Sequence, residues 1–146
     1  MEPQDYNKEY ARIYKEFDDL YHEVALGMGF SDSAFEILYG ITVCGEGCTQ
    51  KELCDLSCTK KQTVNSAIQK LAREGVLWLE SGRARTVHVY LTEEGKQIVK
   101  EKIEPILQYE CAVFEEMPSK EREELLRLSK KYLDSLKEKL RKGEEK

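Results

Sequence analysis

The sequence predicts a mainly α-helical protein with one β-hairpin, and three observations support this fold class. Apolar residues recur at three- and four-residue steps over most of the chain, as on one face of an α-helix. Helix-capping patterns of the type Ser/Thr-x-x-Glu/Gln occur close together, at Ser33, Thr49 and Thr59. β-branched and aromatic residues concentrate in two runs, VLWLE and TVHVYL, which SGRAR separates.

The first half of the chain is expected to form four helices. A helix over about 5–25 carries an apolar stripe that comprises Tyr6, Tyr10, Ile13, Phe17, Leu20 and Val24. Ser33 and Glu36 are predicted to cap a second helix that ends at CGEG, and Thr49 caps the short helix QKELCDL. After the turn SCT, Thr59 is expected to cap the helix TKKQTVNSAIQKLAR, which Gly75 ends.

The second half is expected to be a hairpin followed by two long helices. Arginines lie at the hairpin tip, Thr92 caps the next helix, and Pro105 is expected to kink it. The last helix carries Leu126, Leu133 and Leu140 at seven-residue spacing. The 146 residues are therefore predicted to form a single domain: a winged helix-turn-helix over 31–95, flanked by dimerisation helices over 5–30 and 96–142.

Charge is distributed unevenly along this acidic chain. The net charge is −5, yet residues 59–86 contain six basic and two acidic residues, a local +4. A basic patch on an otherwise acidic protein gives one part of its surface a positive electrostatic potential. The sequence contains no apolar run of membrane-spanning length and no secretory-type N-terminus, so a cytoplasmic protein without membrane contact is expected.

The helix over about 60–73 has a face of uncharged hydrogen-bonding side chains opposite its apolar stripe. Such a face suits base reading in the DNA major groove, because amides and hydroxyls match the donor and acceptor patterns of base edges. The expected base-reading residues are Lys61, Gln62, Thr63, Asn65 and Ser66. The residues expected at the DNA backbone or in the wing (about 80–86) are Thr49, Lys60, Lys70, Arg83 and Arg85. The alternative is a solvated face on a winged helix that binds proteins and not DNA.

Three segments in this order resemble the MarR family of bacterial transcriptional regulators: TQKELCDL, KKQTVNSAIQKLAREGVL and GRARTVHVYLTEEG. The resemblance implies a homodimer on a pseudo-palindromic operator, with repression, or sometimes activation, that a small ligand or oxidation relieves. It places Gln62, Thr63, Asn65 and Ser66 in the reading helix and matches Arg85 to the wing arginine. This chain has Arg83 where many members have an Asp. An aromatic effector pocket is implied, for which the candidates are Tyr10, Tyr14, Tyr21 and Tyr39; the favoured alternative is that these tyrosines are ordinary core residues.

Dimerisation is also favoured by the two long apolar stripes, which a compact helix-turn-helix core cannot cover. The alternative is that these helices pack together within one subunit. No phosphate loop, nucleophile elbow or paired-carboxylate pattern is present, so neither catalysis nor a cofactor is expected.

The five cysteines raise the possibility of a redox- or metal-responsive regulator. Cys44, Cys48, Cys54 and Cys58 form two C-x3-C pairs, with Cys44, Cys48 and Cys58 as the redox candidates. The glycines of CGEGC argue against a shared helical face, so a metal site is not expected. Cys54 and Cys111 are expected to be packing residues, and His22 and His88 are expected to be surface or packing residues.

Overall fold

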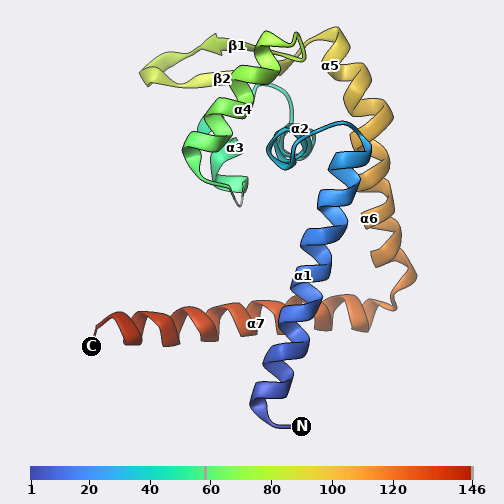
Figure 1. The fold of residues 1–146 in the computed structure, drawn as a ribbon, viewed down its shortest axis with the longest axis vertical. Coiled ribbons are helices and arrows are strands. Elements are labelled where there is room, and N and C mark those ends of the chain that lie inside the picture. Colours follow the sequence, from blue (N-terminus) through green and yellow to red (C-terminus); the bar gives the residue numbers. More distant parts are fainter. Residues whose placement is uncertain (58, 146) are drawn as a thin grey trace. The chain divides into compact units, whose positions relative to one another are not determined.

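The computed structural model describes residues 1–57 and 59–145, which divide into two compact units, Met1–Pro105 (unit 1) and Ile106–Lys146 (unit 2). Unit 1 begins with the helices α1 (Pro3–Gly27), α2 (Asp32–Cys44), α3 (Gln50–Leu56) and α4 (Lys61–Arg73). The strands β1 (Leu77–Ser81) and β2 (Val87–Leu91) follow, joined through a single 3-10 turn, η1 (Arg83–Arg85). After them come α5 (Glu93–Ile98), the π-helical segment η2 (Val99–Ile103), α6 (Glu104–Glu116) and α7 (Ser119–Glu144) (Figure 1). The predicted fold class, mainly helical with a hairpin wing, is confirmed.

The core of unit 1 forms where α2, α3 and α4 pack against the hairpin and η2. Figure 1 shows α2 end-on, with α3 and α4 beside it. The α4 side chains Val64, Ile68 and Leu71 are buried, as are Leu38 and Ile41 of α2. Burial of such aliphatic side chains stabilises a fold by about 1.5–3 kcal/mol each. The apolar stripe predicted for α4 is thus the face that attaches this helix to the domain.

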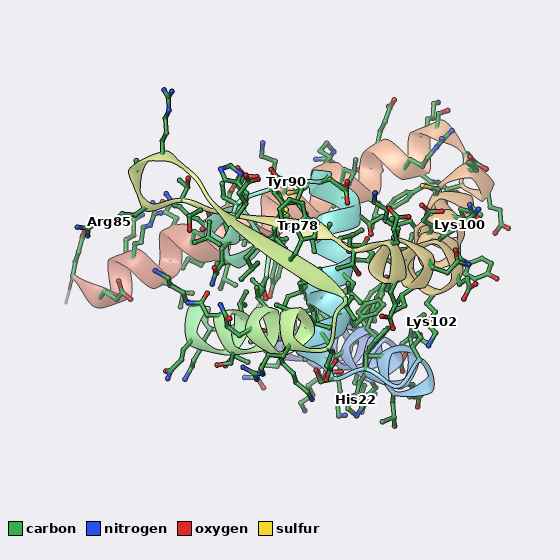
Figure 2. All side chains as sticks on the ribbon, turned by 90° about the horizontal axis from the view of Figure 1, so that it is seen from above. His22, Trp78, Arg85, Tyr90, Lys100 and Lys102 are labelled. Carbon is green, nitrogen blue, oxygen red and sulfur yellow. The ribbon has the colours of Figure 1, made fainter. Side chains whose placement is uncertain are left out.

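Strands β1 and β2 pair antiparallel, with Leu77 opposite Leu91 and Trp78 opposite Tyr90. Val89 is fully buried, and Leu77 and Leu91 are nearly so, because they face the helical core. The rings of Trp78 and Tyr90 stack with centroids 4.3 Å apart on the other face of the hairpin (Figure 2). The alternation of buried and exposed side chains fixes the strand register.

Four helix N-caps were predicted, at Ser33, Thr49, Thr59 and Thr92, and two of them are correct. The Thr49 hydroxyl accepts a hydrogen bond from the Glu52 amide, and the Thr92 hydroxyl accepts one from the Gly95 amide. Helix α4 ends at Arg73, and Gly75 follows its C-cap residue Glu74 with a φ of 77°, in the left-handed region expected for the glycine that closes the helix.

The predicted caps at Ser33 and Thr59 are wrong. Ser31 caps α2 instead, because its extended backbone lets its hydroxyl accept from the Ala34 amide. Thr59 does not cap α4, because its hydroxyl donates to the Glu36 carboxylate, 2.7 Å away. Lys60 is the N-cap residue, with no side-chain cap, so α4 begins at Lys61.

The helical run after the hairpin departs from regular α geometry just before Pro105, in the π segment η2. Proline removes a backbone donor and crowds the preceding turn, which accounts for the π segment before it, whereas the expected kink at Pro105 stays a prediction. Gly95 lets this run pack closely on the hairpin, since a Cβ at this position would lie 2.1 Å from the Val76 carbonyl oxygen.

Unit 2 contains most of α6 and all of α7, and none of its described residues is buried. Its exposed apolar side chains are Tyr109, Val113, Phe114, Leu125, Leu126, Leu128, Tyr132, Leu133, Leu136 and Leu140. Among the described helices of both units, none combines the length and the apolar character that crossing a bilayer requires.

Candidate nucleic-acid interface

Helix α4 presents a polar face to solvent on its first two turns. Lys61, Gln62, Thr63 and Ser66 are exposed, whereas Val64 and Ile68 on the opposite side are at most 1% exposed. Burial of the apolar stripe fixes which face of α4 is exposed, because successive helical side chains are about 100° apart. Amide, hydroxyl and ammonium groups on one exposed face can together pair with base edges.

Asn65 is placed differently from the other predicted base-reading residues. Its side chain is half-buried, and its amide oxygen accepts a hydrogen bond from the Gln50 amide at 2.5 Å. The Cys54 thiol also points to this oxygen, at 3.8 Å. Asn65 therefore ties α4 to α3 in this structure, whereas its predicted base contact stays a prediction.

The hydroxyl oxygen of Ser66, on the polar face of α4, can still accept a hydrogen bond. Its hydroxyl donates to the Gln62 carbonyl one turn earlier, at 2.9 Å. This bond uses the hydroxyl hydrogen and leaves the oxygen lone pairs for a donor outside the helix.

The residues predicted for phosphate contact are spread over three elements. Lys60 and Lys70 are exposed at either end of the α4 face, and Lys70 lies 3.9 Å from Glu74, a surface pair of little energetic weight. Thr49 is half-buried and is engaged as the cap of α3. Its amide at the helix N-terminus is the type of group that binds phosphate oxygens.

The wing tip carries Arg83 and Arg85, both exposed (Figure 2 labels Arg85 at the end of the hairpin). Ala84 and Arg85 adopt positive φ angles of 56° and 60°, and the Thr86 amide donates to the Arg83 carbonyl. Two successive left-handed residues form the tight turn that matches the twist of a hairpin. Non-glycine residues in this conformation store about 1 kcal/mol or more each. The tip is therefore a strained turn that projects its guanidinium groups into solvent.

His88 fixes the base of the wing through partners that the sequence did not identify. Its Nδ1 lies 2.7 Å from the Gly47 carbonyl oxygen, and His88 forms a β-bridge with Thr49. The Val89 amide donates to the Cys48 carbonyl beside it. These bonds hold the hairpin against the segment that leads into α3, so His88 is a packing residue, as one of the expected alternatives stated.

Glu36 is the second residue that sequence reasoning missed in this region. Its carboxylate oxygen accepts hydrogen bonds from the hydroxyls of Ser57 and Thr59, each at 2.7 Å. The two donors flank the turn between α3 and α4. A single carboxylate on α2 therefore holds the entry to α4, and its only sequence signal was the Ser33–Glu36 pattern, which is typical of a helix cap.

Comparison with known proteins identifies this architecture. No protein-family model and no curated protein sequence matches the chain. Similar solved structures include a MarR transcriptional regulator from Methanosarcina mazei, with 23% identity, a TM-score of 0.64, and coverage of 92% of this chain and 98% of that one. A MarR/EmrR family regulator from Acinetobacter gives 18% identity and a TM-score of 0.70, with coverage of 90% and 96%. The MepR–DNA complex of S. aureus gives 16% identity and a TM-score of 0.72, with coverage of 90% of this chain and 96% of that one.

The chain has the MarR-type winged-helix fold. In this fold, α4 is the second helix of the helix-turn-helix and exposes its polar face. The β1–β2 hairpin is the wing and exposes its tip. The resemblance seen in the sequence is thus matched by structures that cover nearly the whole chain.

The MarR-type fold of this chain also contains a groove of about 630 Å³ between α1, α2 and the end of α3. Its lining includes Tyr39, a predicted effector residue, and Tyr21, which the sequence also suggested. Tyr10 and Tyr14 are not among its lining residues; their rings pair edge-to-face with centroids 5.1 Å apart. The structure therefore brings two of the four effector candidates, Tyr21 and Tyr39, to the groove.

The described cysteines differ in their accessibility. Cys44 and Cys111 are exposed free thiols, Cys54 is half-buried, and Cys48 is buried. Burial raises the pKa of the Cys48 thiol to about 11, which disfavours the reactive thiolate. Cys58 lies outside the described residues. Within 1–57 and 59–145, no group of three or more His, Cys, Asp or Glu side chains is arranged to hold a metal ion.

Proposed function

We propose that this chain is a sequence-specific, non-catalytic DNA-binding transcriptional regulator that acts as a homodimer on a pseudo-palindromic operator, most simply as a repressor. The polar, locally basic first half of α4 carries this proposal. Lys61, Gln62, Thr63 and Ser66 are exposed there, on a helix whose opposite face is buried. A surface with that chemistry on a helix-turn-helix suits the major groove.

The structural neighbours support DNA as the partner. MepR, whose fold is similar at a TM-score of 0.72, has been solved in complex with DNA. Another neighbour, BpsR of Bordetella bronchiseptica, has its DNA binding regulated by 6-hydroxynicotinic acid, at 18% identity and a TM-score of 0.62. By analogy, the operator is bound through α4 and the wing, and a small molecule modulates that binding.

The exposed apolar side chains support the homodimer. On α1, Ile13, Phe17 and Leu20 are each at least half exposed, and α6 and α7 display the apolar residues of unit 2. Soluble monomers rarely leave such long apolar stripes in water. A second copy of the chain would cover them and would present two reading helices to two half-sites.

A binding-site selection from random duplexes, followed by titration across a salt series, tests the proposal with the full-length chain. We expect one preferred sequence with two related half-sites and an affinity that falls steeply with salt. Gln62→Ala should reduce discrimination at one base position by about 1–3 kcal/mol, whereas Arg85→Ala should weaken all duplexes similarly and lower the salt slope.

The matched control is Gln108→Ala, an exposed glutamine of α6 outside the candidate interface. This variant should retain the wild-type affinity and base preference. A folded protein that binds no duplex at low salt would refute the proposal and would favour a winged helix that binds proteins.

A further inference from the structure

The oxygen and the nitrogen of the Asn65 side-chain amide have different surroundings. The oxygen accepts a hydrogen bond from Gln50 Nε2 at 2.5 Å, and the Cys54 thiol donates to the same oxygen at 3.8 Å. A carbonyl oxygen has two lone pairs, so these two donors of α3 occupy its acceptor positions. Within 1–57 and 59–145, no acceptor is bonded to the Asn65 NH2 group, which can only donate.

Asn65 belongs to a row of side chains on the polar face of α4. Lys61 lies one turn before it and Gln69 one turn after it, and both are exposed. Side chains four residues apart lie above one another on a helix. The half-buried Asn65 is therefore partly open to solvent between two exposed neighbours, while its oxygen is bonded to α3. The nitrogen is the end of this side chain that is available to a base edge.

An amide that can only donate selects a different base from a free asparagine. A free asparagine pairs with adenine, because its oxygen accepts from N6 while its nitrogen donates to N7. Asn65 cannot form this pair while its oxygen is bonded to Gln50 and Cys54. Guanine presents two acceptors in the major groove, O6 and N7, and both suit an NH2 group. Adenine N6 and cytosine N4 would each place a donor against this donor.

We propose that Asn65 reads guanine, and that Gln50 is the positioning residue that sets this preference by holding the Asn65 oxygen away from the base. The inference deepens the proposed function and rests on it, because it requires α4 to be the reading helix. Gln50 acts through its bond to Asn65 and needs no base contact of its own. In a dimer on a pseudo-palindromic operator, the same guanine recurs in both half-sites.

Binding-site selection with the full-length chain and with Asn65→Ala identifies the base that Asn65 reads. The preference should relax at one position of each half-site in Asn65→Ala. The wild-type chain should prefer guanine over adenine at that position by at least about fivefold. A wild-type preference for any other base there, or the lack of a position that depends on Asn65, would overturn the proposal.

The variant Asn65→Asp inverts the outward group and keeps the inward one. One carboxylate oxygen can still accept from Gln50 and Cys54, whereas the other replaces the outward NH2 group with an acceptor. The preference at the Asn65 position should shift at least about fivefold from guanine towards cytosine, whose N4 donates. Gln69→Glu is the matched control, because it adds the same charge one turn later and should leave the guanine preference unchanged. A guanine preference that survives in Asn65→Asp would contradict the inference.

The variant Gln50→Met tests the positioning role and replaces Asn65→Asp as the test should that variant not fold. Methionine has a length similar to that of glutamine but cannot donate, so a lone pair of the Asn65 oxygen becomes available to adenine N6. The ratio of guanine to adenine at the Asn65 position should fall at least about threefold. Loss of a purely structural contact would weaken all duplexes equally, and that result would overturn the role of Gln50. Gln108→Met, at an exposed position of α6, should leave affinity and preference unchanged.

The outcomes of the selection distinguish this inference from the proposed function. An operator that lacks guanine at the Asn65 position would refute the inference and leave a DNA-binding regulator. A folded chain that selects no duplex would refute the proposed function and this inference together.

Discussion

Unit 1 and unit 2 contain similar kinds of apolar residues but use them in opposite ways. Every residue of the buried hydrophobic core, from Ala25 to Ile103, belongs to unit 1. In unit 2, by contrast, leucines at helical spacing along α7 lie 39–64% exposed. An apolar stripe stabilises a protein only where it is removed from water. Unit 1 therefore has a core of its own, whereas no described residue of unit 2 is buried, and the proposed homodimer is what would cover its apolar stripe.

The sharpest test of this contrast is a substitution in the unit 1 core. Leu71→Ala removes a side chain that is 2% exposed and should lower the free energy of unfolding by about 3 kcal/mol. The loss should be independent of protein concentration in chemical denaturation, because the cavity lies within one subunit. If the loss of unfolding free energy changed with protein concentration, the core of unit 1 would depend on association between subunits.

The next test places a charge on the unit 2 stripe. Leu133→Glu, at a position 48% exposed in one chain, should raise the dimer dissociation constant at least about 100-fold, because the interface would bury an unpaired carboxylate. Sedimentation over a concentration series measures this change. Ser135→Glu, which adds the same charge on another face of α7, should leave dissociation unaffected. Unchanged assembly in Leu133→Glu would remove this stripe from the interface.

A smaller effect compares a buried thiol of unit 1 with an exposed thiol of unit 2. Burial raises the pKa of Cys48 from 9.0 to about 11, so the native state holds its proton where the unfolded chain releases it. The protonated Cys48 thiol contributes about 2 kcal/mol to the free energy of unfolding. This contribution is complete below pH 9 and is lost as the pH rises towards 11.

Wild type should therefore lose more stability than Cys48→Ala over this interval, as measured by denaturation at several pH values. Cys111→Ala, which removes an exposed thiol, should follow the wild-type pH dependence. Alkylation of native protein should likewise modify Cys111 before Cys48. Identical pH slopes in wild type and Cys48→Ala would contradict the burial of this thiol.

Local features of this chain could be predicted from the sequence. The hairpin, the caps at Thr49 and Thr92, and the two faces of α4 depend on residues within a few positions of one another. Periodicity and capping act over one helical turn, so they can be recognised in the sequence without knowledge of the packing.

Contacts between elements distant in the sequence were decided by the tertiary structure. Thr59 has the sequence of a helix cap, but a carboxylate 23 residues earlier takes its hydroxyl, and α4 therefore begins at Lys61. Asn65 has the chemistry of a base reader, but Gln50, 15 residues away, takes its amide oxygen. A polar side chain bonds to the partner that packing brings within reach, and that partner is defined only when the helices have assembled.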